Sequence, residues 1–290
     1  MPREVLVAFT HAEVEAIAQE HGIDLLHIKG AALDAELRRP MSEESGGLRT
    51  SVDADILVRP THLALLDRAL RAHGWTRLYD FADGSTFEHA ATWVTEGLSS
   101  LDVHRHFPGI EIDRERAFDL LWANRKDSPV AGVRCSVPDL ADQRLIVIIH
   151  AARGRSRRDD EDRARAWTTV TEEERDAIEA RADELGARVA LRAGTGRIET
   201  VRGARTYPLW KQLVDSDGSR LSLWWSRVSS APTLPAAIRT GVRMVLPNTR
   251  RMETALGRPP TKGEVARAYG RQARYGARVL RQTVSRRRGR

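Results

Sequence analysis

Two aspartates separated by a single residue, Asp53 and Asp55, have the residue type and spacing of a pair that could bind a metal ion. They lie in Val52–Val58, a run of aliphatic residues that predicts a strand. Because side chains alternate between the faces of a strand, both carboxylates are expected on one face and the residues between them on the other. Two such carboxylates repel unless a cation lies between them, and their oxygens suit Mg²⁺. The same pair also occurs at ordinary solvated strand ends.

A third carboxylate, Asp102, lies in a second predicted strand, Leu98–His104. Alternation places Leu101 and Val103 on one face and directs Asp102 and His104 to the other. Asp102 could therefore reach the same metal ions from an adjacent strand. For His104 two interpretations stay open: it contacts a substrate phosphate or orients Asp102, or it is a polar strand residue beside the site.

Lys29 and Gly30 lie between a predicted short strand, Ile23–Ile28, and a predicted helix, Ala31–Arg38. Backbone amides and the helix dipole can hold phosphate at such a junction. A glycine lets the phosphate approach the backbone closely, and a lysine adds a positive charge. Arg49, in the polar loop that precedes the paired aspartates, is a reasonable position for holding a nucleotide.

The elements that position these residues are predicted from capping and periodicity. Thr10 and Glu13 have the spacing of a capping box, which predicts the start of the first helix, and Gly22 predicts its end. Further strands are predicted at Trp75–Tyr79, Thr86–Val94 and Val133–Val137, and further helices at 61–74, Arg114–Ala123, 138–152 and Glu172–Leu191. The stretch Arg153–Arg165 is almost entirely charged and is predicted to be a mobile loop or an exposed helix end.

Length and composition allow one large domain or two modest ones. The chain has 290 residues, 41% of them hydrophobic, so the bulk of it should fold around a core. A single cysteine, Cys135, excludes an internal disulfide framework and fits a reducing compartment. No apolar run has the length of a membrane span, and the first 20 residues do not resemble a secretory signal. We therefore expect a cytoplasmic protein.

Positive charge is concentrated at the C-terminal end. Residues 239–290 contain 15 basic and two acidic residues, whereas the preceding 238 carry a net charge of −6. A helix is predicted to begin at Thr261 and Glu264, which form another capping box. Five arginines would occupy one face of it: Arg267, Arg271, Arg274, Arg278 and Arg281. Such a stripe can follow a phosphate backbone, but it can equally be a solvated face or part of a solubilising tail.

In combination these motifs resemble the uncharacterised nucleotidyltransferase family of the polymerase-β-like superfamily. The similar segments are LLHIKGAAL at 25–33, LRTSVDADILV at 48–58, RALRAHGW at 68–75, SLDVHRHF at 100–107 and, more loosely, MVLPNTRRM at 244–252. The resemblance implies an α/β (α+β) fold, with a polymerase-β-like core around a mixed sheet and a helical C-terminal region. We expect the core at 1–152, a helical region at 153–238 and a basic helical segment at 239–290.

The resemblance also implies an activity. Asp53, Asp55 and Asp102 would be the catalytic carboxylates that hold Mg²⁺ or Mn²⁺, and the nucleotide would be bound by Lys29, Gly30, Arg49 and His104. The reaction would transfer a nucleotide from a nucleoside triphosphate, with ATP as one candidate, and release pyrophosphate. A small molecule or a peptide natural product is the favoured acceptor. An RNA-modifying, toxin-like enzyme and an inactive nucleotide- or nucleic-acid-binding protein are the alternatives.

The sequence departs from the family pattern in two places. The superfamily usually has Gly-Gly or Gly-Ser at the phosphate-binding loop, where this chain has Lys29 and Gly30. Related proteins usually continue with a Trp-rich helical segment where this chain has the charged stretch Arg153–Arg165. Because clustered carboxylates repel in the absence of metal, we also expect that replacing Asp55 with alanine leaves the fold intact.

Overall fold

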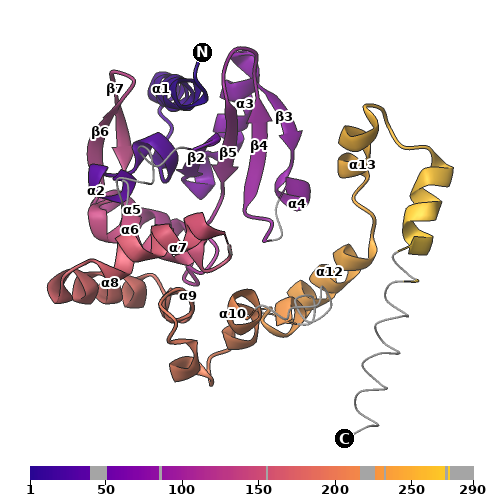
Figure 1. Cartoon of the computed structure of the whole chain (residues 1–290). Coiled ribbons are helices and arrows are strands. Elements are labelled where there is room, and N and C mark those ends of the chain that lie inside the picture. The colour runs from indigo at the N-terminus through magenta and orange to yellow at the C-terminus, as the bar shows by residue number, and fades with distance from the viewer. Residues whose placement is uncertain are drawn as a thin grey trace, which may run out of the picture. The chain divides into compact units, whose positions relative to one another are not determined.

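The structure, a computed structural model, describes residues 1–39, 51–84, 87–154, 156–215, 226–231, 233–271 and 274. The chain forms two compact units, Met1–Arg197 and Ile198–Arg290 (Figure 1). The expected boundary after residue 152 therefore lies inside the first unit, and the three-part division by function stays a prediction. Within the ranges described, no helix is both long enough and apolar enough to cross a membrane.

A five-stranded mixed sheet lies at the centre of the first unit. Its strands are β1 (Leu25–His27), β2 (Asp53–Val58), β3 (Thr76–Tyr79), β4 (Ala90–Val94) and β5 (Ser100–His104). They are arranged in the order β1-β2-β5-β4-β3, and β2 and β5 run parallel while the other neighbouring strands are antiparallel. The predicted mixed α/β fold is confirmed.

One face of this sheet packs against two helices, α1 (Arg3–His21) and α3 (Leu63–Ala72). Strands β2 and β5 contribute to this core Ala54, Ile56, Val58, Leu101 and Val103, all at most 3% exposed. The alternation expected from the sequence is thus confirmed, and the opposite face of both strands carries the polar side chains. Burial of one face fixes the register, because a slip of one residue would exchange the two faces.

Helix α1 begins earlier than expected. It starts at Arg3, and Thr10 lies inside it, fully buried, with its hydroxyl donating to the Leu6 carbonyl at 2.8 Å. Glu13 does not return to cap a helix start, since its carboxylate accepts a hydrogen bond from Trp75 Nε1 at 3.3 Å. The predicted capping box was wrong because its two polar side chains make tertiary contacts instead.

A two-stranded hairpin packs against α1 and β1. It consists of β6 (Lys126–Val130) and β7 (Val133–Val137), and buries Cys135 between them and α1. Only β7 was predicted. The residues of β6, Lys-Asp-Ser-Pro-Val, are mostly exposed and lack the apolar alternation that identifies a strand.

Helices follow the hairpin: α6 (Leu140–Ala151), α7 (Arg157–Arg163), α8 (Glu172–Glu184) and α9 (Arg188–Gly194), with α7, α8 and α9 all packing on α6. The single helix predicted for Glu172–Leu191 is broken at Gly186, whose φ is +63°. Gly194 lets α9 approach α6, because a Cβ there would lie 2.5 Å from Ile148 Cγ2.

The charged stretch after α6 forms a helix of its own rather than a loop. Ser156 and Asp159 form a reciprocal capping box at the start of α7. Asp162 on α7 is 3% exposed and receives a hydrogen bond from Arg165 Nη1 at 3.0 Å. Composition left a mobile loop and an exposed helix end open, and it does not reveal that one carboxylate of the run is buried against a neighbouring arginine.

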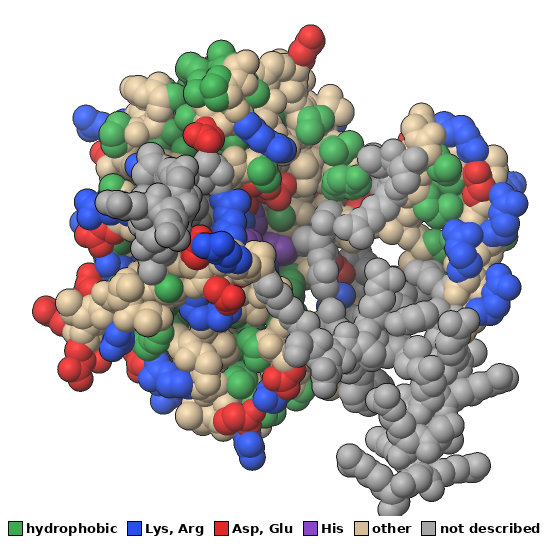
Figure 2. All heavy atoms as spheres, in the orientation of Figure 1, with side chains coloured by type: hydrophobic (Ala, Val, Ile, Leu, Met, Phe, Trp, Pro, Cys, Tyr) green, Lys and Arg blue, Asp and Glu red, His purple; other side chains and the backbone are tan. Residues whose placement is uncertain are grey.

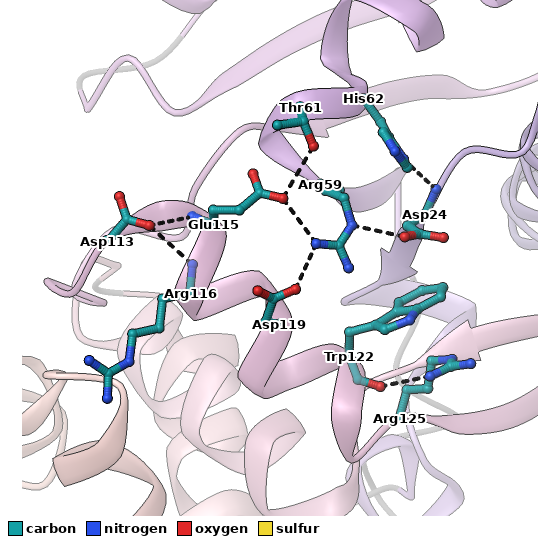
Figure 3. A network of polar contacts seen from close by, with 10 residues as sticks. All are labelled: Asp24, Arg59, Thr61, His62, Asp113, Glu115, Arg116, Asp119, Trp122 and Arg125. Atoms are coloured by element: carbon teal, nitrogen blue, oxygen red, sulfur yellow. Dashed lines mark hydrogen bonds and ion pairs between the residues drawn. The ribbon is translucent and has the colours of Figure 1, made fainter.

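A cluster of polar residues connects the end of β2 to α5 (Arg114–Ala123), as Figure 3 shows. Arg59 donates from Nε to Asp24 at 2.8 Å, and from Nη1 to Glu115 at 2.9 Å and Asp119 at 2.6 Å. Its guanidinium also lies 4.7 Å from the centre of the Phe118 ring. We call this group the Arg59 cluster. It joins the chain before β1, the end of β2 and α5 through a single side chain.

The second unit is helical in its described residues. It contains α10 (Tyr207–Val214), α12 (Leu234–Val245), α13 (Thr249–Leu256) and a further helix at 262–271. The capping box predicted at the start of the last helix is confirmed, since Thr261 and Glu264 exchange hydrogen bonds. Arg267, Arg271 and Arg274 are exposed, while Arg278 and Arg281 lie outside the described residues. Their role stays a prediction.

Candidate functional site

The parallel pairing of β2 and β5 brings two of the three aspartates together. Asp55 is paired directly with Asp102 in the register, and Asp53 precedes Asp55 by two residues on the same strand face. Asp55, Asp102 and His104 each offer one ligand atom, and these three atoms all lie within 4.8 Å of one another. We call Asp53, Asp55 and Asp102 the acid cluster. The sequence placed all three on one face, and the register supplies the proximity.

Asp55 is the buried member of the acid cluster, at 2% exposed. Its Oδ1 receives the Lys29 ammonium at 2.7 Å and His104 Nε2 at 2.8 Å. Burial alone would raise the pKa of Asp55, but the Lys29 charge and the hydrogen bond from His104 lower it well below its usual value. Asp55 is therefore ionised and is held by a cation of the chain itself.

The other two carboxylates contact no such cation among the described residues. Asp53 accepts from the Ser51 hydroxyl at 3.2 Å, and Asp102 accepts from the Thr92 hydroxyl at 2.7 Å. Burial, and then the negative charge of Asp55, raise the pKa of Asp53, and they raise that of Asp102 to about 6. Among the described residues neither forms an ion pair, so the acid cluster carries more negative charge than its surroundings offset.

The segment before β2 differs from the expected strand–helix junction. Instead of one helix there are two short turns, η1 (Gly30–Ala32) and α2 (Ala35–Arg38). Gly30 has a φ of +68°, and a Cβ there would lie 3.1 Å from the Ser51 Cβ, so this position favours glycine on both counts. Lys29 turns its ammonium onto Asp55, as described above, which places it at the acid cluster. Arg49 lies outside the described residues.

A pocket of about 240 Å³ opens beside these groups. Its walls include Lys29, Asp53 and Asp55 on the sheet side. The opposite wall comes from α6 and α7, which contribute His150, Arg158, Asp159 and Asp162. The contribution of α7 was missed from the sequence. The Ser156–Asp159 capping box was the signal that a helix begins there.

Comparison with known proteins identifies the family. The family described as uncharacterised nucleotidyltransferase matches residues 3–203, more than half of the chain. The chain belongs to this family. The match includes the acid cluster, Lys29, Gly30 and the helices up to α9, and it ends before the segment 244–252 that was noted as a looser resemblance. The protein is thus a nucleotidyltransferase, as predicted, and enzymes of this class use a nucleoside triphosphate and a divalent metal.

Two solved structures are also similar to this nucleotidyltransferase. One is the solution structure of the antibiotic-resistance factor ANT(2'')-Ia, with 13% identity, a TM-score of 0.36, and coverage of 67% of this chain and 91% of that one. The other is an antigenic nucleotidyltransferase-like protein from Paracoccidioides brasiliensis, with 13% identity, a TM-score of 0.35, and coverage of 66% and 92%. Likenesses this distant add nothing to the assignment. No curated protein matches the sequence.

His104 lies beside the acid cluster, and its hydrogen bond goes to Asp55 rather than to Asp102. The ring is buried, which lowers its pKa, and its Nδ1 has no hydrogen-bond partner among the described residues. With Nε2 donating to the carboxylate, His104 fixes the orientation of Asp55. Whether it also contacts the nucleotide stays a prediction.

A group of histidines and aromatic rings continues from His104 away from the acid cluster. The centre of the His104 ring lies 5.0 Å from that of His89 and 6.2 Å from that of Phe107, whose plane is inclined to it by 24°. The centre of the His106 ring lies 6.2 Å from that of His89. Burial lowers the pKa of His89 and brings that of His106 to about 3, so both rings are neutral. Figure 2 shows histidine side chains between acidic and basic ones near the middle of this face.

A separate buried group lies under the hairpin. His27 Nε2 contacts Glu15 Oε2 at 2.9 Å, and the Nδ1 atoms of His27 and His11 are 2.7 Å apart. Glu15, His27 and Cys135 have the spacing of a possible metal site. The hydrogen bonds between α1 and β1 account for the two histidines and the glutamate as a buried polar link, which is how such groups are satisfied in a core.

Proposed function

We propose that this enzyme transfers a nucleotide from a nucleoside triphosphate to a hydroxyl group of an acceptor, using Mg²⁺ or Mn²⁺ held by the acid cluster. The observation that carries the proposal is the direct pairing of Asp55 on β2 with Asp102 on β5, together with the ion pair between Lys29 and Asp55. Three carboxylates and one lysine at the edge of a pocket form a site that is suited to a metal–triphosphate substrate.

The residues fit a divalent metal. Asp53 and Asp102 each have only a hydroxyl as a hydrogen-bonding side-chain partner within the described part of the chain, and the pKa of each is raised. Hard oxygen ligands with unsatisfied negative charge are what Mg²⁺ and Mn²⁺ select. Asp53, Asp55 and Asp102 would hold the metal, which when bound offsets the negative charge of the transferring phosphoryl group.

Each chain residue then has a separate role in the transfer. Lys29 and the backbone at Gly30 bind triphosphate oxygens, and His104 holds Asp55 in place through its Nε2 hydrogen bond. Asp102 takes the proton of the acceptor hydroxyl. The hydroxyl oxygen bonds to the α-phosphorus, the bond from that phosphorus to the bridging oxygen breaks, and pyrophosphate leaves.

Incubation of the protein with each nucleoside triphosphate, Mg²⁺ or Mn²⁺ and a panel of acceptors tests the proposal by mass spectrometry. The expected result is an acceptor increased by one nucleotide and an equal amount of pyrophosphate. Asp102→Asn should remove both products. Arg71→Gln, on α3 at the opposite face of the sheet, is the matched control and should retain them. Absence of metal-dependent nucleotide binding to the wild-type protein would refute the proposal.

A small molecule or peptide is the acceptor class that we favour. The exposed arginines Arg267, Arg271 and Arg274 offer charge for RNA, but the exposed Tyr269 between them is not on their face of the helix and so adds no stacking surface to it. Binding of RNA at increasing salt decides between the two classes. An affinity that falls steeply with salt, and falls less steeply when these three arginines are replaced by glutamine, would favour RNA instead.

A further inference from the structure

Arg153, just after the C-terminal end of α6, forms no ion pair with a carboxylate of the residues that the structure describes. Its Nη2 donates to His150 Nδ1 at 3.1 Å, and its Nη1 faces His89 Nε2 at 3.5 Å. Its Nε is buried and has no hydrogen-bond partner, and no acidic residue in the described ranges forms an ion pair with it. Other partly buried arginines of the chain differ, since Arg59, Arg144 and Arg181 each contact two or more acidic residues.

The surroundings of Arg153 hold its guanidinium in place without neutralising it. The group lies 5.7 Å from the centre of the Phe87 ring and 5.3 Å from that of Phe107. Burial lowers the pKa of Arg153 to about 10, which still leaves it charged at neutral pH. The charge of Asp55 favours the charged form of Arg153, but the groups in contact with the guanidinium are ring nitrogens and ring faces. Burying a charge among such groups is costly, and an anion in contact with it would offset that cost.

Two contacts connect Arg153 to the acid cluster. His150, which accepts its hydrogen bond, lines the same pocket as Lys29 and Asp55. On the other side, His89 lies against His104, and His104 donates to Asp55. Arg153 therefore lies beside the pocket at which Lys29 meets Asp55, and both cations can act on one ligand.

We propose that Arg153 binds the polyphosphate of the nucleotide, contacting the β- and γ-phosphate oxygens that depart as pyrophosphate, while Lys29 and the acid cluster with its metal act on the α-phosphate. The proposal rests on the proposed function and adds a residue from the charged stretch to its substrate site. The planar guanidinium suits bidentate contact with phosphate, and the two histidines and two rings hold it ready for that contact.

Isothermal titration with inorganic tripolyphosphate and Mg²⁺ tests the anion site without any acceptor. Arg153→Gln should weaken binding by about tenfold or more, the effect of losing a charge-assisted hydrogen bond. Arg71→Gln is the matched control, because Arg71 also lies over an aromatic ring, at 5.2 Å from that of Trp93, but pairs with Asp67 on the opposite face of the sheet. Equal affinity of Arg153→Gln and the wild-type protein, or no binding by the wild type, would overturn the proposal.

A structural role for Arg153 predicts a different result. If the guanidinium serves only to stabilise the end of α6, Arg153→Met should lower the melting temperature of the ligand-free protein. If it is kept for an anion, Arg153→Met should leave that temperature unchanged or raise it, and should abolish the further increase that tripolyphosphate gives to the wild type. Arg153→Lys, which keeps the charge but not the planar group, should bind tripolyphosphate with intermediate affinity.

The two proposals can fail separately. If tripolyphosphate binding depends on Arg153 but no nucleotide is transferred under any condition, the anion site stands and the proposed function fails. If transfer occurs and Arg153→Gln changes neither the KM for the nucleotide nor the affinity for tripolyphosphate, the proposed function stands and the anion site is wrong.

Discussion

Strand β2 has a group of three carboxylates at each end, and the two groups are neutralised in different ways. At its end, Asp24, Glu115 and Asp119 all contact the single guanidinium of Arg59 at 2.6 to 2.9 Å. At its start, the acid cluster has the Lys29 ammonium on Asp55, while Asp53 and Asp102 have only hydroxyl partners among the described residues. Every carboxylate of the first group therefore contacts a cation, whereas two of the three in the second group contact none among the described residues.

This difference separates a structural group from one suited to bind a ligand. The Arg59 cluster satisfies its charges with residues of the chain, so it stabilises the fold and has no need of a ligand. The acid cluster leaves negative charge at the edge of a pocket, which makes the ligand-free protein less stable and favours a bound cation. Asp55 is an exception inside its own cluster. Its loss would leave Lys29 and His104 without their acceptor, so the expectation that Asp55→Ala leaves the fold intact no longer holds.

Asp102→Asn should have the largest effect on activity. The amide keeps the shape but lacks the charge and the basicity, so transfer should fall on the order of 1,000-fold, as for the loss of several kcal/mol of transition-state stabilisation. The ligand-free protein should become more stable by roughly 3 kcal/mol at pH 7, because a charge that is disfavoured by burial and by Asp55 is removed. Rates per folded molecule and urea unfolding measure the two effects. If Asp102→Asn lost activity only because it unfolds, the contrast between the acid cluster and the Arg59 cluster would be wrong.

Arg59→Gln should have the opposite pattern. Three carboxylates would face one another without a cation, and the free energy of unfolding should fall by about 2 kcal/mol, less than for a fully buried pair because Asp119 is exposed. The rate of transfer per folded molecule should not change. Urea unfolding of both Arg59→Gln and Arg71→Gln tests this. The control Arg71→Gln should lower the free energy of unfolding by less than about 0.5 kcal/mol. Equal losses in the two variants would show that the Arg59 cluster contributes nothing special.

The sequence predicted the acid cluster well because alternation is a local property. Apolar residues at positions 54, 56 and 58, and again at 101 and 103, determine which face each aspartate occupies. The end of α1 at Gly22 was predicted for the same reason, since a φ of +63° is required there and glycine provides it. Registers between strands are not local, so the pairing of Asp55 with Asp102 needed the structure.

What could not be predicted depends on tertiary partners. Thr10 and Glu13 have the spacing of a cap, but Ser99 and Trp75 bind them inside and beside α1. The charged stretch 153–165 has a composition typical of a mobile segment, and yet its Asp162 and Arg165 pair in a buried position. Arg153 was not identified because the role proposed for it depends on which side chains contact its guanidinium, and no spacing in the sequence reports those contacts.

The pH dependence of stability should differ between the wild type and Asp102→Asn. The pKa of Asp102 in the folded protein, about 6, exceeds its ordinary value of 3.8, so folding favours the protonated form. Its contribution to stability is therefore present below about pH 4 and is lost as the pH rises through about 6. In metal-free buffer the wild type should lose roughly 3 kcal/mol relative to Asp102→Asn over this interval. A constant difference between the two proteins would show that Asp102 is not strained by its neighbours.

Thr92→Val should have the smallest effect and tests how much a single neutral partner does for the acid cluster. The Thr92 hydroxyl, which donates to Asp102 at 2.7 Å, lowers the pKa of that carboxyl against the larger effects of burial and of Asp55. Valine keeps the β-branched shape on β4 and removes only the donor. The pH at which the loss of stability is complete should therefore be higher in Thr92→Val than in the wild type by less than about one unit, and the affinity for Mg²⁺ near pH 6 should weaken by about tenfold at most. Unfolding and Mn²⁺ or Mg²⁺ titrations between pH 5 and 8 measure both shifts. A larger loss, close to that of Arg59→Gln in stability, would mean that one hydroxyl balances Asp102 as fully as an arginine balances the other group, and the contrast between the two ends of β2 would then disappear.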